Sequence, residues 1–205
     1  MKIIPLTPET KENILENLLK RSPSQYGEYE ERVNQILAKI KEEKDQALFA
    51  YTEAFDKVRI TKDTIRVSDE EIEEAYGLVD PALIQVIRKS LENIRAYHER
   101  QRQNSWFTSS EKGTMLGQKV IPMEKVGVYV PGGKAVYPSS VLMNIVPAKT
   151  AGVSRIIMTT PPGKDGKVNP STLVAAKEAG ADEIYKAGGA QAIAALAYGT
   201  ESIPK

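Results

Sequence analysis

Residues 126–140 read VGVYVPGGKAVYPSS, an apolar β-strand that runs into a loop rich in glycine, proline and hydroxyl side chains. A simple reversal of the chain needs only two or three turn residues, whereas this loop is longer and places Gly132 and Gly133 between Pro131 and Pro138. The pattern indicates that the loop does more than join two elements, and it is a candidate for binding a ligand.

From Val126 onward, apolar strand patterns and helical patterns alternate. Strands are expected at VGVYV, RIIMTT and EIYKA, and helices at about 140–151, 169–179 and 190–198. Alternation with short connections is typical of right-handed βαβ crossovers. The sequence therefore predicts an α/β fold with a Rossmann-like parallel sheet.

The chain before this region is predicted to be mainly helical up to about residue 105. Thr7 before Pro8 is a predicted helix start, Ser68 with Glu71 matches a capping box, and Asp80-Pro81 opens a long helix. A break is expected near KEEKD, and the segments SWFTSS and TMLGQKVIPM are expected to be short strands, with Pro122 marking an edge or a bend. Apolar residues recur at helical spacing at Ile14, Leu15, Leu18 and Leu19, and again at Tyr29, Val33, Ile36, Leu37 and Ile40.

Three domains are predicted from these shifts in pattern. Residues 1–25 form an N-terminal helical extension, residues 26–125 the mainly helical part of an incomplete first domain, and residues 126–205 the Rossmann-like α/β domain. The last of these is expected to be truncated at its C-terminal end. One face of the last helix and one edge of the sheet would then lack their usual cover.

Composition excludes several classes of function. The 28 Lys and Arg residues balance 27 Asp and Glu residues, so nothing argues for binding to nucleic acid or to an anionic membrane. With no cysteine and only one histidine, His98, the chain has no disulfide, no thiolate metal site and no thiol nucleophile. No apolar run approaches the ~20 residues of a membrane-spanning helix, and the N-terminus does not resemble a signal peptide, so a cytoplasmic protein is expected.

Ligands of parallel α/β sheets bind at the carboxyl edge, where three loops meet in this prediction. These loops read PGGKAVYPS, PPGKDGKVN and GGAQ. Paired glycines beside a helix N-terminus let backbone N–H groups approach an anion, which is typical of nucleotide sites. Neither a GxGxxG fingerprint nor a Walker loop is present, so the alternative that the glycines only serve tight turns stays open.

Four side chains are candidates for contact with a ligand, each with an alternative. Gln191 lies in the first turn of an alanine-rich helix and offers a donor and an acceptor, or it is simply solvated. Tyr129 lies in its strand just before the loop, where an inward phenol needs a partner, and the alternative is a core tyrosine with a satisfied hydroxyl. Lys134 could meet a phosphate but suits solvent equally well, and His98 near a helix end suits a solvated residue better than a metal ligand.

The stretches KVGVYVPGGKAVYPSSVLMNIVPAKTAGVSRIIMTTPP and AGADEIYKAGGAQAIAALAYGTESIPK resemble the histidinol dehydrogenases, and the helical region through IRAYHERQ fits the same family. The resemblance implies a pair of incomplete Rossmann-like domains related to the aldehyde dehydrogenases, in a homodimer. It implies NAD-dependent oxidation of L-histidinol through histidinal to L-histidine, the last steps of histidine biosynthesis. It also implies a zinc ion that holds the substrate and a Glu-His pair for acid-base chemistry.

Matched by motif, Tyr129 of YVPGG and Gln191 of GGAQA look like two of the family's NAD contacts. The family's zinc ligands, its catalytic pair and most of its substrate contacts lie beyond ESIPK, so no catalytic residue and no metal ligand is expected in this chain. The 205 residues are therefore expected to be an N-terminal piece that is inactive alone. The alternatives are a non-catalytic nucleotide-binding or dimerisation module, or one half of a split enzyme.

Overall fold

The computed structural model describes residues 5, 7–12, 27–132 and 135–205. Residues 8–12 are helical, and the amide of Thr10 donates a hydrogen bond of 3.1 Å to the hydroxyl of Thr7, which confirms the predicted helix start. The predicted apolar stripe from Ile14 to Leu19 and the loop residue Lys134 lie outside the described residues, as does most of the predicted extension 1–25.

Between residues 27 and 99 the chain is helical in the places predicted from the sequence. The helices here are α2 (Gly27–Glu43), α3 (Asp45–Asp56), α4 (Asp69–Leu78) and α5 (Pro81–Glu99). Lys44 separates α2 from α3 with a positive φ of 50°, at the predicted KEEKD break. The Ser68–Glu71 capping box is present in both directions, and Asp80 caps α5 by accepting a hydrogen bond of 2.8 Å from the amide of Ala82.

The second half forms the predicted α/β unit. Its elements are β3 (Lys125–Tyr129), α6 (Pro138–Ala151), β4 (Arg155–Thr160), α7 (Pro170–Ala179), β5 (Glu183–Lys186) and α8 (Gly189–Tyr198). The three strands are parallel in the order β3-β4-β5, with Tyr129 opposite Thr159 and Thr159 opposite Tyr185. The fold class predicted from the sequence is therefore confirmed.

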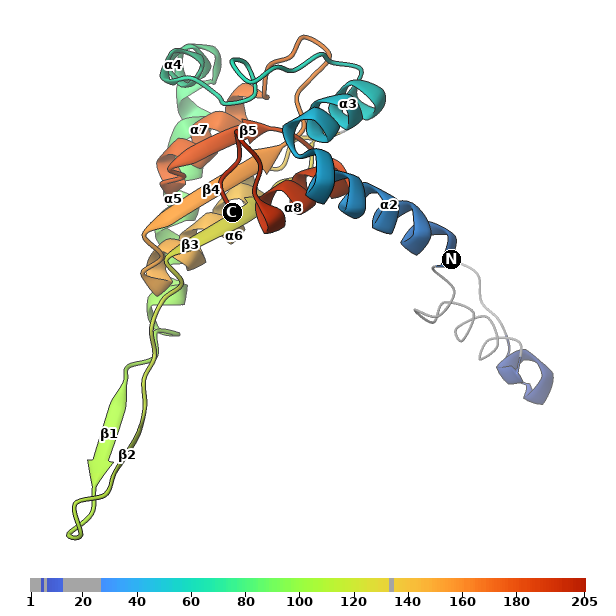
Figure 1. The fold of residues 1–205 in the computed structure, drawn as a ribbon. Helices are drawn as coiled ribbons and strands as arrows, with labels where there is room; N and C mark the ends of the chain where they lie inside the picture. The colour runs from blue at the N-terminus through green and yellow to red at the C-terminus, as the bar shows by residue number, and fades with distance from the viewer. Residues whose placement is uncertain (1–4, 6, 13–26, 133–134) are drawn as a thin grey trace.

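Helices cover both faces of this sheet, and each face has its own core (Figure 1). Ile156, Met158 and Ile184 pack with α4, α5, α6 and α7, whereas Ile157 and Tyr185 pack with α2, α3 and α8. Alternate residues of a strand point to opposite faces, so Tyr129 and Thr159 belong to the α8 face.

The segment before α4 runs along the outer edge of β5. The amide of Val67 donates to the carbonyl of Ile184, the amide of Lys186 donates to the carbonyl of Ile65, and Arg66 bridges to Tyr185 in antiparallel fashion. This edge of the sheet is therefore covered, while β3 forms the other edge. On α8, Ile193 and Tyr198 are exposed.

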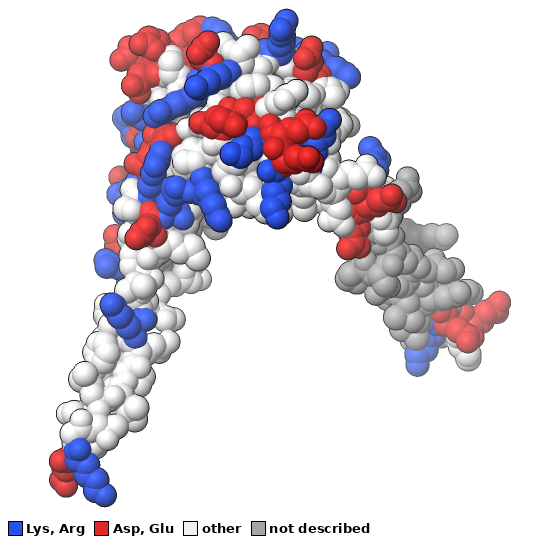
Figure 2. Space-filling view, in the orientation of Figure 1, with Lys and Arg blue, Asp and Glu red and all other residues white. Residues whose placement is uncertain are grey.

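A two-stranded antiparallel arm extends away from the body of the molecule (Figure 1). It consists of β1 (Trp106–Ser109) and β2 (Met115–Gln118), and all eight strand residues are exposed. The predicted short strands are thus present, and no strand includes Pro122. Figure 2 shows Lys, Arg, Asp and Glu mixed over the body, whereas most of the arm carries no charge.

Candidate cofactor site at the carboxyl edge of the sheet

The three loops at the carboxyl edge meet at one proline. A Cβ atom added to Gly132 would lie 2.9 Å from Cγ of Pro161, and one added to Gly188 would lie 2.6 Å from Cβ of the same proline. Real Cβ atoms do not approach so closely, so glycine is required at both positions by the contact between the loops. These two glycines thus have a role in the packing of the loops, and the same packing brings the ends of β3, β4 and β5 together.

Tyr129 joins the end of β3 to the start of α8. Its side chain is half-buried, and its hydroxyl accepts a hydrogen bond of 3.4 Å from the amide of Gly189. Gly189 has a φ of +65°, which glycine adopts without strain, and it follows Gly188 at the helix N-cap. The N-cap residue Gly188 has no side chain with which to cap this helix, so the first-turn amides that follow Gly189 keep their donor capacity.

Gln191 is buried in the first turn of α8, with 1% of its surface exposed, so the alternative of a solvated residue is wrong. Its Oε1 atom is buried and has no hydrogen-bond partner among the described residues. A side chain at Gly189 would place its Cβ 2.7 Å from this oxygen, so the missing side chain at Gly189 is what makes room for the Gln191 amide. An unpaired buried amide oxygen is costly in a folded protein, so this oxygen has a hydrogen-bonding capacity that the described residues leave unused.

Thr159 is a second buried polar residue of this face that the sequence analysis did not single out. It lies opposite Tyr129 in the parallel register, is fully buried, and its Oγ1 has no partner among the described residues. The sequence offers little reason to select Thr159 as a site residue. Thr159 and Thr160 follow RIIM, and threonine is common in β-strands. Only the register shows which of the two hydroxyls lies on the Tyr129 face.

A cavity of about 480 Å³ opens on the opposite side of the same edge. Its lining includes Gly132, Thr160, Pro161 and Asn169, and neither Tyr129 nor Gln191 contributes to it. Since Thr160 neighbours Thr159, the two hydroxyls point to opposite faces of the sheet. The structure thus places the two predicted cofactor residues near one another but outside this cavity of about 480 Å³.

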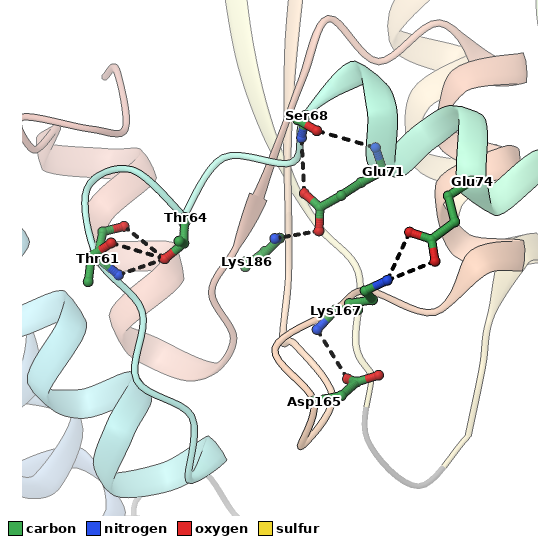
Figure 3. A network of polar contacts seen from close by, with 8 residues as sticks. All are labelled: Thr61, Thr64, Ser68, Glu71, Glu74, Asp165, Lys167 and Lys186. Carbon is green, nitrogen blue, oxygen red and sulfur yellow. Dashed lines mark hydrogen bonds and ion pairs between the residues drawn. The ribbon is translucent and has the colours of Figure 1, made fainter.

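Charged side chains close the cavity toward α4 (Figure 3). Lys167 Nζ contacts both carboxylate oxygens of Glu74 at 2.8 Å, and this hydrogen bonding raises the pKa of Lys167. Lys186 at the end of β5 is buried and contacts Glu71 at 2.6 Å, while the other oxygen of Glu71 accepts from the amide of Ser68. These pairs fix α4 against the loop after β4 and against the end of β5.

Within residues 5, 7–12, 27–132 and 135–205, no group of three or more His, Asp and Glu side chains could hold a metal ion. His98 is half-buried on α5, where its Nδ1 lies 2.6 Å from Oε1 of Gln101. The zinc ion that the resemblance implies therefore finds no fitting site among these residues. In the same part of the chain, no helix is both long and apolar enough to cross a bilayer.

Comparison with known proteins assigns most of the chain to one family. The family model described as histidinol dehydrogenase matches residues 19–205. Histidinol dehydrogenase of Bacillus subtilis is 57% identical over 186 residues, which cover 90% of this chain and 43% of that protein. Histidinol dehydrogenase of Caldanaerobacter subterraneus is 45% identical over all 205 residues and 47% of its own length.

The fold agrees with a solved structure. The crystal structure of histidinol dehydrogenase from Elizabethkingia anophelis matches with a TM-score of 0.80 at 42% identity, over 86% of this chain and 40% of that one. The chain thus spans less than half the length of the relatives that it matches.

Proposed function

The chain belongs to the histidinol dehydrogenase family, and on that premise we propose that it supplies cofactor contacts for the NAD-dependent oxidation of L-histidinol through histidinal to L-histidine. The observation that carries the proposal is the buried Oε1 of Gln191, which has no hydrogen-bond partner among the described residues. It lies in the first turn of the helix whose Gly189 amide donates to the hydroxyl of Tyr129. A cytoplasmic location and a homodimeric assembly follow from the same premise as proposals.

The described residues suit a dinucleotide in two ways. Because the Tyr129 hydroxyl accepts its bond from Gly189, its own proton remains available for a ligand. The Gln191 amide offers a donor and an acceptor, although its burial means that the first turn of α8 must adjust before a ligand can reach it. When bound, NAD supplies the hydride acceptor, while Tyr129 and Gln191 hold and orient it.

The acid-base and zinc chemistry of the family is proposed to lie outside these residues. His98 is the chain's single histidine and bonds to Gln101, and no carboxylate among the described residues bonds to it as a Glu-His pair would require. We therefore expect the 205-residue chain alone not to oxidise histidinol. Turnover of L-histidinol by the purified chain, followed as NADH absorbance, would overturn this expectation.

A second candidate function is a non-catalytic dimerisation module or one half of a split enzyme, and the arm favours association of some kind. Its exposed large apolar residues are Trp106, Phe107, Met115 and Leu116, each at least 55% exposed. A two-stranded hairpin is marginally stable alone in water, so contact with another surface would stabilise the arm.

Calorimetric titration of NAD into the purified chain tests the cofactor proposal. We expect weak binding that Gln191→Ala and Tyr129→Ala each reduce about fivefold or more, since each removes a hydrogen bond. Gln118→Ala and Tyr97→Ala are matched controls, because both residues are exposed and lie elsewhere. Binding that all four variants weaken equally, or no heat at millimolar NAD, would contradict a cofactor site formed by this chain alone.

A further inference from the structure

A second cavity, of about 440 Å³, lies where the end of β5 meets two loops. We refer to it as the basic cavity, because basic side chains predominate in its lining. The lining has five basic residues, Lys57, Arg59, Lys164, Lys167 and Lys186, and two acidic ones, Glu71 and Asp165. Neither Tyr129 nor Gln191 contributes to the basic cavity, so what it binds is independent of the proposed cofactor site.

Local backbone geometry brings these residues together. Lys57 ends α3 in the left-handed conformation, with a φ of 61°, and the chain then turns toward Ile60. Gly166 has a φ of +77° in the turn after β4, and a Cβ there would lie 3.6 Å from Cγ1 of Val58. The turn 163–167 thus packs directly against residues 57–60, so that basic residues distant in the sequence share one cavity.

Of the two acidic groups of the basic cavity, Glu71 is engaged at both carboxylate oxygens and Asp165 at one. Both carboxylate oxygens of Glu71 have partners, Lys186 at 2.6 Å and the amide of Ser68 at 3.1 Å. Asp165 Oδ1 accepts from the backbone amide of Lys167 at 3.1 Å within its own turn. Figure 3 shows both carboxylates turned toward these partners.

The cations are only partly engaged. Lys167 pairs with Glu74, and Lys57 Nζ donates to the carbonyl of Ala54 at 2.7 Å. Arg59 and Lys164 are exposed and make no hydrogen bond or ion pair with any residue that the structure describes. The basic cavity therefore carries an excess of positive charge at its mouth and a buried ammonium group, Lys186, in its wall.

We propose that the basic cavity binds a small phosphorylated ligand. Arg59 offers a planar fork of donors that matches phosphate oxygens, and Lys164 adds a mobile point charge from the facing turn. A concave site with one sign of charge also concentrates anions near it. Lys186 in the wall is paired with Glu71, so the uncompensated charge that a phosphate meets comes from Arg59 and Lys164.

Titration of the full chain with inorganic phosphate at constant ionic strength, followed by amide NMR shifts, tests this proposal. We expect saturable shifts centred on residues 57–60 and 164–167. The double variant Arg59→Gln/Lys164→Gln should bind about tenfold more weakly or worse, because two charged hydrogen bonds are lost. The charge-matched control is Lys112→Gln/Lys119→Gln, which changes two exposed lysines outside the basic cavity and should bind as the unmodified chain does.

A second variant, which is expected to raise the affinity for phosphate, makes the test more specific. Glu71→Gln keeps a residue type that completes a capping box, yet it removes the carboxylate that competes for Lys186. Phosphate should then bind about threefold more tightly or better. Equal affinity in the two double variants, or shifts that spread over the surface without saturating, would overturn the proposal. If Glu71→Gln fails to fold, the comparison of the two double variants still tests whether the basic cavity binds phosphate.

Discussion

The backbone amide of Gly189 donates a hydrogen bond to the hydroxyl of Tyr129 across 60 positions of sequence. At 3.4 Å the bond is long, and the tyrosine side chain is only half-buried. It therefore contributes little to folding, while it aims the phenol at the N-terminal amides of α8. This hydrogen bond connects the end of β3 with the start of α8, where two glycine-rich loops were predicted to lie at one edge of the sheet.

Tyr129→Phe should separate binding from stability. Losing one long, half-exposed hydrogen bond is expected to change the free energy of unfolding by less than about 1 kcal/mol, measured by urea denaturation. The affinity for NAD should still fall, because the phenol proton is lost to the ligand. Tyr97→Phe, on the exposed side of α5, is the control. A large loss of stability with unchanged affinity would instead make Tyr129 a structural residue.

Gly188→Ala should disturb the junction of the three loops. The added Cβ would lie 2.6 Å from Cβ of Pro161 and 3.3 Å from its Cα, and a proline ring cannot swing aside. We expect a loss of about 1–3 kcal/mol in the free energy of unfolding, together with weaker NAD binding.

Gly77→Ala provides the matched control for that substitution. A Cβ at Gly77 meets no atom within 4 Å, and the residue lies within α4 at an ordinary helical φ. Alanine there should leave stability unchanged or raise it by up to about 1 kcal/mol. If Gly188→Ala proves as harmless as Gly77→Ala, the close packing on Pro161 is not what holds the loops together.

The order and type of the elements followed from local signals. The Ser68–Glu71 box, the Asp80-Pro81 start and the alternation after Val126 each depend on residues close in sequence, and each is present. Boundaries shifted slightly at α6, which begins at Pro138 rather than near 140. The antiparallel run of residues 65–67 along β5 could not be predicted, because it depends on a tertiary contact across more than a hundred positions.

The site was predictable only as a location. Glycine pairs and the βαβ pattern predicted that the loops meet at the carboxyl edge of the sheet, and Tyr129 and Gln191 do lie near one another there. The burial of Gln191 and the orphan hydroxyl of Thr159 depend on which face each residue takes and on what packs above it. A one-residue change of strand register would exchange Thr159 with Thr160, so only the structure distinguishes them.

Glu178 should make the stability of the chain depend on pH. Arg88 donates to it at 3.0 and 2.7 Å, and Tyr76 donates at 2.8 Å. The hydrogen bond from Arg88 is the main cause that lowers the pKa of Glu178 below 4.5, against the opposing effect of burial. Because the folded pKa lies below the unfolded one, the carboxylate stabilises the fold above the unfolded pKa, and this is lost as the pH falls through the folded pKa.

Glu178→Gln is therefore expected to cost about 1–3 kcal/mol of unfolding free energy at neutral pH and less near about pH 3.5. Urea denaturation at the two pH values measures the difference. The control is Glu92→Gln, because Glu92 pairs with the exposed Lys89. Its effect on the free energy of unfolding should be small at both pH values. A cost for Glu178→Gln that is the same at both pH values would show that its charge is not what matters.

Trp106 is the chain's single tryptophan and lies on the arm with 55% of its surface exposed, so its fluorescence reports on the arm alone. In a dilute solution of the chain, the emission of Trp106 should resemble that of tryptophan in water, and acrylamide should quench it fully. If the arm mediates the proposed homodimer, the emission should shift to shorter wavelengths as the protein concentration rises. The sedimentation coefficient should increase over the same range of concentration. The variant Phe107→Ser/Leu116→Ser should abolish both changes, whereas Leu78→Ser, an equally exposed apolar residue on α4, should not. Dimerisation with the tryptophan still open to acrylamide would place the interface elsewhere, because an arm buried between two copies cannot leave its indole in water.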